Sequence, residues 1–528
     1  MSVYDYIVIG GGISGLFMTY KLSETGAKIL LLESSTRLGG RIHTKREKGV
    51  QFELGAARIG AKHTKMLSLI NDLGLQEDLV KLPSKINYKI KGSKVNFYSL
   101  VKEVFKDSKL YTRKYLQTVN LKQLCIDILG HDGATLLQNK LGYDSEFEFL
   151  NAHHALKSYK KDIFSVSDYF VMKNGLTTVV DALVKLLEDK DNVKIKLDAS
   201  VTDIGKNHIQ IGKNKKYGSI IICCTPYQTL KQFPKFKDVS EVDAVKPVPL
   251  IRIYAKYPKG KDGKVWFHGL DRTITDNYIR DIIPIDYESG LIMISYTDGS
   301  YADMWKNLSK LGNKVLIEKL HKEIKEVLGK SPPQPDFITS YYWSEGVHMW
   351  KPGYDVKEVY EKIMKPFPEE KIYVVNEAYS KHQCWMEGSL DASYDALELI
   401  DPKFKRGKPK KSGGNRSIEG GSRKQLKRRS KVYTIQQVLK KRNWIVLDIR
   451  KQLRIYDVGK WFKDHPGGAD HLRQGIKANK HYLNKDKYPE SPIDLFKSVS
   501  KHSSSRVIQK MLVKGTDKVK YVGVLKKV

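Results

Sequence analysis

Cysteine is scarce in this 528-residue chain, and long hydrophobic runs are missing. Four cysteines are too few for a disulfide framework and fit a reducing compartment, the cytoplasm. No apolar run approaches the roughly 20 residues that a membrane helix needs. The apolar stretch Tyr6–Tyr20 contains four glycines and no cleavage site follows it, so it predicts neither a signal peptide nor a membrane span. We therefore expect a soluble protein without a transmembrane segment.

Acidic residues are in short supply only toward the C-terminus. The formal net charge is +34, of which residues 1–400 carry +9, residues 401–431 carry +11 and residues 432–528 carry +14. Such a positive field favours an acidic partner, whether nucleic acid, an anionic surface or an acidic protein, and it equally suits a role in solubility alone.

The charge steps coincide with changes in composition. Residues 401–431 are rich in Gly, Ser, Lys and Arg without apolar periodicity, which predicts a basic, flexible, disordered linker. This linker separates a module of residues 1–400 from a small module of residues 432–528.

The large module opens as strand, glycine turn, helix and strand, a βαβ start. Strands and helices then alternate irregularly, which predicts an α/β fold: a Rossmann-like nucleotide domain with a sheet-containing substrate domain interleaved in it. We assign the nucleotide domain to residues 1–80, 170–235 and 365–400, and the substrate domain to 81–169 and 236–364. Further strands are expected at Ser219–Cys224, Pro249–Ala255, Leu291–Tyr296 and Ile372–Val375, and helices at Leu176–Leu187, Val315–Leu328 and Val356–Met364.

A glycine motif lies in the first turn. Gly10, Gly12 and Gly15 form G-x-G-x-x-G between a strand and a helix, where the backbone can approach a pyrophosphate and the helix N-terminus offers free N–H groups. Glu33 ends the second strand, where a carboxylate can accept hydrogen bonds from ribose hydroxyls. Together these residues predict dinucleotide binding.

A second glycine turn follows in "ESSTRLGGRI". Its guanidinium groups suit phosphate, and its glycines let the backbone pass close to a ring system. The run resembles the flavin-containing amine oxidase family, in which E-x3-R-x-G-G-R lines FAD. "FELGAARIG" is similar to the next flavin-contacting segment of that family. The resemblance implies FAD contacts at Arg37, Gly39, Gly40, Arg41, Glu53, Gly55 and Ala56.

The resemblance continues to about residue 400. Val201 matches the valine at the adenine end, and "IYVVNEAYSKHQCWMEG" is similar to the closing motif, which implies FAD contacts at Glu377, Met386, Glu387 and Gly388. Asn174 and Asn376 stand where the family usually has glycine, and asparagine tolerates a left-handed backbone best. Met349 falls where some members carry a cysteine bonded to the flavin, so non-covalent FAD is implied.

The resemblance also implies the chemistry, oxidation of an amine to an imine and then an aldehyde. A neutral amine is required, so the site should be apolar, and Trp385 and Trp350 match the aromatic walls of the family. Tryptophans of the core or of a lid are the alternative, and Trp343 belongs to the same segment as Trp350. Arg252 takes the place of the usual lysine that assists dioxygen. Arg252 could assist the reaction with dioxygen as a fixed cation, or it could be a structural ion-pair partner. A third alternative is that the reduced flavin reacts poorly with dioxygen and passes its electrons to another acceptor.

The small module resembles cytochrome b5. Strands are expected at Trp444–Asp448 and Arg454–Tyr456, and "DHPGG" presents a histidine in a fixed turn. The resemblance implies haem b held by His465 and His502, a pairing that suits electron transfer. His471 and His481 are rival second ligands, and a degenerate domain without haem is the other alternative.

Three classes of function follow. The first is an FAD-dependent oxidoreductase that oxidises an amine and passes electrons to dioxygen, giving hydrogen peroxide, or to the fused haem. The second is a flavin desaturase or dehydrogenase of a non-amine substrate. The third is a basic structural protein with a vestigial flavin site. Lysine outnumbers arginine 75 to 18, which indicates an A/T-rich genome, and with this domain pair it associates the chain with large DNA viruses and a virion location.

Overall fold

The computed structural model describes residues 3–91, 95–162 and 168–404, together with the backbone of four short segments at 432–433, 444–449, 452–457 and 520–525. The chain divides into two compact units, residues 1–412 and 413–528. That boundary falls within the expected linker, of which residues 405–431 lie outside the described residues. Among the described helices, none is long and apolar enough to cross a membrane.

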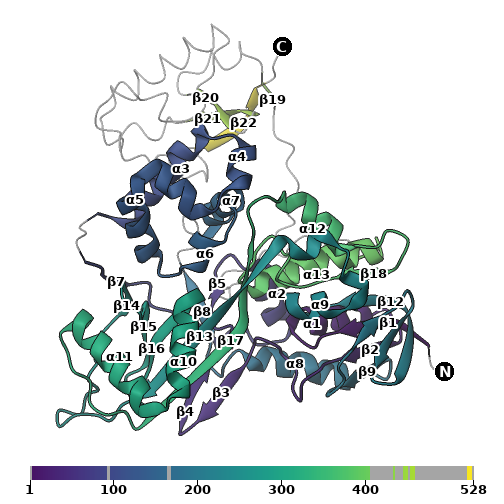
Figure 1. Ribbon diagram of the computed structural model, residues 1–528. Helices are drawn as coiled ribbons and strands as arrows, with labels where there is room; N and C mark the ends of the chain where they lie inside the picture. Colours follow the sequence, from purple (N-terminus) through teal and green to yellow (C-terminus); the bar gives the residue numbers. More distant parts are fainter. Residues whose placement is uncertain are drawn as a thin grey trace, which may run out of the picture. The chain divides into compact units, whose positions relative to one another are not determined.

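A seven-stranded, mostly parallel sheet forms one layer of the first unit (Figure 1). Its central strands are parallel and nearly all apolar, as expected for strands that are covered on both faces. The strand order is β10 (Asp203–Ile204), β11 (His208–Ile211), β12 (Asn214–Cys223), β1 (Val3–Ile9), β2 (Ile29–Leu32) and β9 (Val193–Lys196), with β18 (Ile372–Val374) beside β12.

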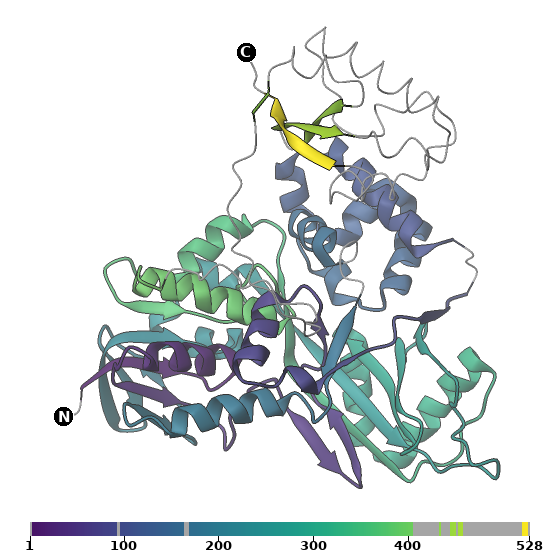
Figure 2. The same cartoon turned by 180° about the vertical axis from the view of Figure 1, so that it is seen from behind.

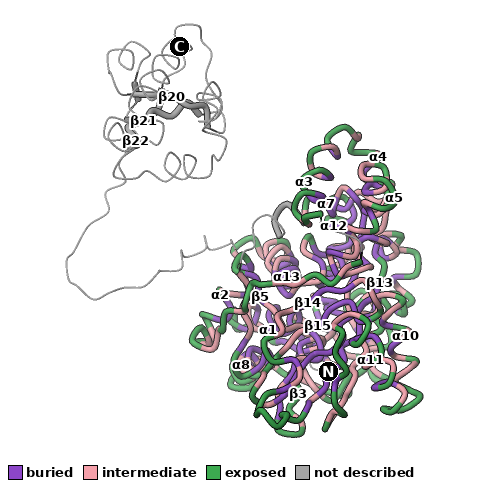
Figure 3. Tube along the Cα trace, turned by 90° about the vertical axis from the view of Figure 1, so that its left-hand side faces the viewer, coloured by how far each residue is buried: buried purple, intermediate pink, exposed green. Residues whose placement is uncertain are grey.

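Helices from three distant parts of the sequence cover this sheet (Figures 1 and 2). Helix α1 (Ile13–Ser23) packs against α8 (Thr177–Glu188) and α13 (Met386–Ile400), and α13 also packs against α2 (Thr64–Asp72). The side chains between these helices and the sheet form one buried core, and the buried residues of the first unit lie toward its inside in Figure 3. The mixed α/β architecture expected from the sequence is therefore present.

A six-stranded sheet forms the second layer. Two helices, α10 (Gly299–Lys310) and α11 (Asn313–Leu328), lie beside it, and Trp305 is among the core side chains there. Its order is β17 (Phe337–Trp350), β13 (Val245–Lys256), β16 (Leu291–Asp298), β15 (Asp281–Asp286), β14 (Arg272–Thr275) and β7 (Ile86–Lys89).

A helical lobe that sequence reasoning did not predict completes the first unit (Figure 2). It consists of α3 (Phe97–Asp107), α4 (Arg113–Thr118), α5 (Leu121–Leu141), α6 (Ser145–Glu148) and α7 (Ala152–Asp162). The signal was present in the sequence: Asn96, Thr112 and Asn120 each accept a backbone hydrogen bond as the N-cap of α3, α4 and α5.

Shorter elements connect the layers. The hairpin β3 (Thr44–Glu47) and β4 (Val50–Glu53) follows the second glycine turn. A three-stranded sheet joins β5 (Ile59–Gly60), β8 (Tyr169–Met172) and β6 (Leu79–Lys81). Helices α9 (Tyr227–Gln232) and α12 (Val356–Met364) flank the segments that return to the seven-stranded sheet.

The described part of the second unit is a four-stranded sheet. Its order is β19 (Val432–Tyr433), β22 (Lys520–Leu525), β21 (Gln452–Asp457) and β20 (Trp444–Ile449), with β20 and β21 antiparallel. The two expected strands therefore fall within β20 and β21. His465 and His502, with the rivals His471 and His481, lie outside the described residues.

Candidate active site

A cavity of about 1010 Å³ is lined by residues of both large sheets of the first unit. On one side it meets the carboxyl ends of β1, β2, β12 and β18, the edge at which open α/β sheets bind ligands. On the other side it meets β13, β16 and β17. The predicted site residues that line it are Gly10, Gly12, Glu33, Arg37, Gly39, Gly40, Arg41, Gly55, Ala56, Val201, Arg252, Glu377, Trp385 and Met386.

The glycines of the first turn have different roles. Gly10 has a φ of +102°, and a Cβ at Gly15 would lie 1.9 Å from the Gly10 carbonyl oxygen, so Gly15 lets α1 pack on β1 without lining the cavity. A Cβ at Gly12 would meet no protein atom within 4 Å. Gly12 is the N-cap of α1 and faces the cavity, which leaves room at the helix N-terminus for a phosphate group.

Glu33 holds this turn while facing the cavity. Its Oε2 accepts from the Gly11 N–H at 2.7 Å, and its Oε1 accepts from the Ser35 N–H at 2.9 Å. Oε1 also accepts from the Ser35 hydroxyl at 2.8 Å, so of the roughly four acceptor positions of a carboxylate, one on Oε2 remains for a ribose hydroxyl.

Arg37 lines the cavity and also has a structural role that the sequence did not predict. Its guanidinium donates to the carbonyl oxygens of Leu38 at 3.1 Å, Ile42 at 3.2 Å and Gly40 at 2.5 Å. Its donors therefore hold the second glycine turn in shape. The sequence could not reveal this role, because the tight turn brings its own carbonyl groups to the guanidinium.

Arg41 belongs to a buried ionic network. It donates to the Gly346 carbonyl at 3.0 Å and lies 2.8 Å from Glu377 Oε2, which also lies 3.0 Å from His348 Nδ1. Burial alone would raise the pKa of Glu377, but Arg41 and His348 outweigh it and hold that pKa at about 2. Glu377 is therefore an anion at neutral pH. His348 Nε2 is buried without a partner among the described residues.

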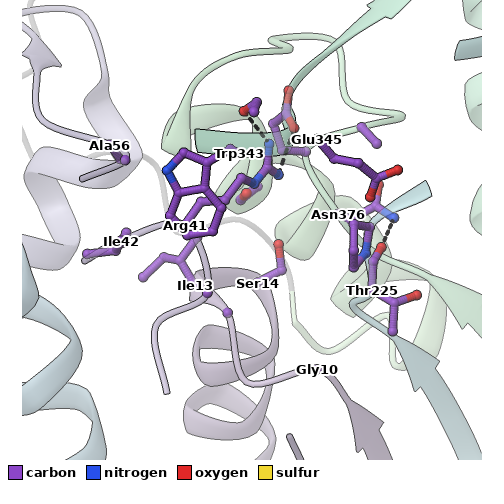
Figure 4. A pocket seen from close by; sticks show the side chains of 18 of the residues that line it. Gly10, Ile13, Ser14, Arg41, Ile42, Ala56, Thr225, Trp343, Glu345 and Asn376 are labelled. Carbon is purple, nitrogen blue, oxygen red and sulfur yellow. Dashed lines mark hydrogen bonds and ion pairs between the residues drawn. The ribbon is translucent and has the colours of Figure 1, made fainter. Parts of the chain in front are cut away.

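A bulge in β17 places the Gly346 carbonyl in this network and orients the neighbouring Glu345. Val248 pairs with Val347 and Leu250 with Trp343, so Ser344–Gly346 on β17 oppose the single residue between them on β13. The bulge presents the Gly346 carbonyl to Arg41, while Glu345 accepts from the Gln228 N–H in the first turn of α9 at 2.9 Å. Figure 4 shows Arg41, Trp343 and Glu345 near the turn of Gly10 and the first residues of α1, Ile13 and Ser14.

The explanation predicted for Asn174 and Asn376 is wrong. Neither is among the described residues with a positive φ, so neither uses the left-handed tolerance of asparagine. The Asn376 side chain instead donates to the Thr225 carbonyl at 2.8 Å and accepts from the Tyr379 N–H at 3.2 Å. Asn174 donates to Asp78 at 3.2 Å. Both asparagine side chains therefore make hydrogen bonds that a glycine could not make.

Two tryptophans line the cavity beyond the glycine turns. Trp385 stacks on Tyr169, with ring centroids 5.9 Å apart, and lies edge-on to His63. Trp343 donates its Nε1–H to the Leu54 carbonyl at 2.8 Å, which fixes the orientation of its indole. Both therefore provide rigid aromatic walls.

The wall predicted at Trp350 is wrong. Trp350 is fully buried, donates its Nε1–H to the Ser380 carbonyl at 3.0 Å and does not line the cavity. The reason is the two-residue period of a strand. Val347 and Met349 of β17 face the cavity, so Trp350 faces the core behind it. Trp343 takes the place in the wall that was predicted for Trp350.

Arg252 reaches the cavity from β13 and is only 5% exposed. Its guanidinium donates to the Glu53 carbonyl at 3.0 Å and lies 4.8 Å from the centre of the Tyr296 ring. Among the described residues no carboxylate lies within ion-pair distance of it, so the predicted alternative of an ion-pair partner finds no support. It is a fixed positive charge in the cavity wall.

The lining residues that sequence reasoning missed include Arg58, Tyr143, Glu146 and Asp298. Arg58 stood inside the quoted segment "FELGAARIG", where its charge was the available signal. The other three come from the helical lobe and the end of β16, which only tertiary structure brings to the site. No local pattern distinguishes them.

The residues present fit FAD. The Gly12 cradle, Glu33 and the start of α13 at Met386 surround an extended space, and Thr225 Oγ1 is buried at its edge without a partner among the described residues. No cluster of three or more His, Cys, Asp or Glu is placed to hold a metal ion in the part of the chain that the structure describes.

Comparisons with known proteins agree with this site. The family of flavin-containing amine oxidoreductases matches residues 13–396. The chain is 36% identical over 96 residues to flavin-containing amine oxidase A of Equus caballus, a match that spans only 18% of each protein. It is 22% identical over 470 residues to the flavin-dependent L-tryptophan oxidase RebO of Lentzea aerocolonigenes, covering 75% of this chain and 97% of that one.

Solved structures share the fold. A putative protoporphyrinogen oxidase of Exiguobacterium sp. 255-15 has a TM-score of 0.59 at 16% identity, covering 76% of this chain and all of the other. A double mutant of putrescine oxidase has a TM-score of 0.60 at 16% identity, covering 75% of this chain and 99% of the other. At such identities the likeness concerns the fold alone.

Proposed function

Because the chain belongs to the family of flavin-containing amine oxidoreductases, and is thus a flavin oxidoreductase, we propose that it oxidises an amine to an imine that hydrolyses to an aldehyde or keto product. The observation that carries this proposal is the cavity of about 1010 Å³, in which a glycine-lined dinucleotide cradle continues into a chamber walled by Trp343 and Trp385. FAD, when bound, supplies the acceptor for the hydride equivalent of the C–H bond beside nitrogen.

The chain's own residues hold the cofactor without a covalent bond. Met349 lines the cavity and has no thiol. The Cys384 thiol also lines it, but burial, followed by the charges of Glu377 and Glu146, raises its pKa well above the usual range. A neutral thiol is a poor nucleophile, so non-covalent FAD is supported.

The aromatic walls exclude water and favour the uncharged amine, the form that can lose a hydride equivalent. Arg252 can hold a water molecule or stabilise developing negative charge, but it cannot release a proton. We therefore assign Arg252 electrostatic support and no general-acid role.

Two electron acceptors follow from the proposal. Dioxygen yields hydrogen peroxide, and haem b on His465 and His502 in the second unit would provide a tethered acceptor. An anaerobic experiment separates them: after reduction of the flavin by substrate, a shift of the haem Soret band supports the tethered acceptor. An unchanged Soret band leaves dioxygen as the acceptor.

An absorbance spectrum combined with an amine screen tests the whole proposal. We expect flavin bands in the purified protein, bleaching on anaerobic addition of an amine, and peroxide release in air. A flavin that only non-amine substrates bleach would move the chain to the desaturase or dehydrogenase class. Protein that stays colourless after FAD is added would support a vestigial flavin site in a basic structural protein.

A further inference from the structure

Glu345 places a carboxylate in the wall of the cavity, at the bulge of β17. It lies near Arg41 and the turn of Gly10 (Figure 4). Its Oε1 accepts from the Gln228 N–H at 2.9 Å. Arg41 is already paired with Glu377, at 2.8 Å. Within the described part of the chain, the negative charge of Glu345 therefore has no direct counter-ion.

Two other carboxylates at the cofactor end are better compensated. Glu377 lies 2.8 Å from Arg41 and 3.0 Å from His348. Glu33 accepts from two backbone N–H groups and from a hydroxyl group. Hydrogen bonds and opposite charges favour the ionised form of a carboxyl group. Of these three carboxylates, Glu345 is therefore the one whose ionised form has the least support.

The charges that line the cofactor end do not balance. Among the described lining residues there, Arg37 and Arg41 supply two positive charges, and Glu33, Glu345 and Glu377 supply three negative ones. One negative charge is thus in excess before a ligand binds. The pyrophosphate of FAD brings further negative charge into the same cavity. Like charges disfavour the ionised form of a carboxyl group, and the least compensated one should respond most.

The surroundings of Glu345 already disfavour its charge. Burial raises the pKa of Glu345 and the charge of Glu377 adds to this effect, while His348, the N–H at the start of α9 and Arg41 oppose it only in part. Tyr379 also faces Glu345, and burial raises the pKa of this phenol well above its usual range, so it stays neutral. The carboxyl group therefore has a raised pKa before FAD adds its own charge.

We propose that FAD binds to this protein together with one proton, which neutralises the carboxylate of Glu345. The neutral carboxyl group still accepts from the Gln228 N–H through its carbonyl oxygen, and its O–H becomes a donor. The backbone of the bulge need not change. The inference concerns binding of the cofactor, so it goes beyond the proposed amine oxidation and holds for any substrate of the flavin.

The proposal fixes the sign of the pH dependence. Below the pKa of Glu345 in the apoprotein, which lies above the ordinary 4.5, the carboxyl group is neutral with or without FAD and the affinity is highest. As the pH rises further, the apoprotein loses the proton while the complex keeps it, so the affinity falls by up to about tenfold per pH unit. Above the pKa of Glu345 in the complex, the affinity is constant and low.

Release of FAD from the full-length, FAD-loaded protein measures this dependence without any substrate. Serial dilution between pH 5 and pH 9, with flavin fluorescence as the signal of free FAD, gives the dissociation constant at each pH. We expect the wild type to bind FAD at least about tenfold more weakly at the upper end of this range. That change corresponds to a difference of about one unit between the two pKa values of Glu345.

Variants of Glu345 separate its charge from its hydrogen bond. Glu345→Gln removes the charge, while its amide oxygen can still accept from the Gln228 N–H. It should bind FAD at least about tenfold more tightly than the wild type at pH 8, with little pH dependence. Glu345→Asp keeps the charge and should keep the pH dependence. Glu148→Gln is the control, because Glu148 pairs with Lys122 and does not line the cavity.

Calorimetry counts the proton directly. FAD is rebound to the same full-length protein near pH 7 in two buffers of different ionisation enthalpy, and the difference in heat gives the protons taken up. We expect a large fraction of one proton per FAD in the wild type and almost none in Glu345→Gln. Binding of FAD without proton uptake by the wild type would overturn the inference even if no variant folds.

The remaining outcomes distinguish this inference from the proposed function. A pH dependence that persists in Glu345→Gln would assign the proton to another group, such as His348, and overturn the inference. Equal or weaker FAD binding by Glu345→Gln at pH 8 would do the same. Both results leave amine oxidation standing. A flavin that binds with the expected pH dependence but is bleached by no amine would overturn the proposed function alone. Protein that binds no FAD at any pH would overturn both.

Discussion

The two ends of the cavity are built in different ways. At the cofactor end the backbone shapes the space: glycines bring turns together, and Arg37 and Glu33 hold those turns by binding main-chain groups. At the substrate end side chains shape the space, and they come from β13, β16, β17 and the helical lobe. A backbone cradle is encoded locally, whereas a side-chain chamber depends on tertiary contacts. The following predictions test that division from the largest expected effect to the smallest.

Trp350→Ala tests where the chamber wall ends. We expect a loss of about 3–5 kcal/mol in the free energy of unfolding, because a fully buried indole and its hydrogen bond to Ser380 disappear. Trp343→Phe should leave the unfolding free energy nearly unchanged and lower kcat/KM for the amine. Urea unfolding followed by tryptophan fluorescence and amine kinetics measure both. If the Trp350→Ala protein is stable but has altered amine kinetics, Trp350 contacts the substrate and its assignment to the core is wrong.

Arg41→Gln tests the ionic network at the cofactor end. Loss of the partner of buried Glu377 should cost about 3 kcal/mol in unfolding free energy and weaken FAD binding. In the wild type the pKa of Glu377 is lowered from 4.5 to about 2. Its contribution to stability is therefore complete above about pH 4.5 and is lost as the pH falls toward 2. Without Arg41, burial is less opposed and the loss should begin at a higher pH.

Melting temperatures between pH 7 and pH 4 check this prediction. Arg113→Gln is the control, because it removes an exposed ion pair with Asp355 and should change the melting temperature little. Matching pH profiles for wild type and Arg41→Gln would show that Arg41 does not set the charge of Glu377.

Gly15→Ala and Gly12→Ala compare packing with ligand space inside one motif. At Gly15 the new Cβ would lie 1.9 Å from a carbonyl oxygen, so we expect a loss of about 1–3 kcal/mol in unfolding free energy even without FAD. At Gly12 the apoprotein should keep its stability, while its FAD affinity falls. Calorimetry of the apoprotein and FAD titration measure the two effects. Equal destabilisation by both substitutions would contradict the assignment.

Tyr143→Phe is the smallest change and tests the substrate end. Removal of the hydroxyl that lies against Arg58 should raise the KM for the amine by about fivefold, which corresponds to a hydrogen bond of about 1 kcal/mol. Tyr342→Phe, which removes a surface hydrogen bond to Asp303, is the control. An unchanged KM in Tyr143→Phe would show that Arg58 is positioned without its help.

The sequence predicts the cofactor end well because that end depends on short-range geometry. The G-x-G-x-x-G turn, Glu33 and the start of α13 at Met386 all lie at the cavity, and the strand–helix–strand opening is where the pattern places it. The hydrogen bonds of Arg37 to the carbonyl groups of its own turn could not be predicted, since they arise only once the turn has closed. Its contact with phosphate stays a prediction.

The substrate end could be predicted only in part. Trp385 was found through its neighbouring motif, but Trp350 was placed in the wall because neither the strand register nor the bulge at Ser344–Gly346 can be read from letters. Glu146 and Asp298 are brought together by hydrogen bonds across more than 150 positions of sequence. The helical lobe that carries Glu146 was missed altogether, although its N-caps were visible.

Strand β17 links the two ends. This strand has 14 residues and pairs with β13. It carries Trp343 in the cavity wall, Gly346 in the ionic network and Trp350 in the core. The same strand therefore contributes to both ends of the cavity. We expect hydrogen–deuterium exchange of the amides of Tyr341 and Trp343 to slow when FAD is added, even in the absence of any amine. Binding of FAD would then reduce the mobility of the chamber wall before a substrate binds.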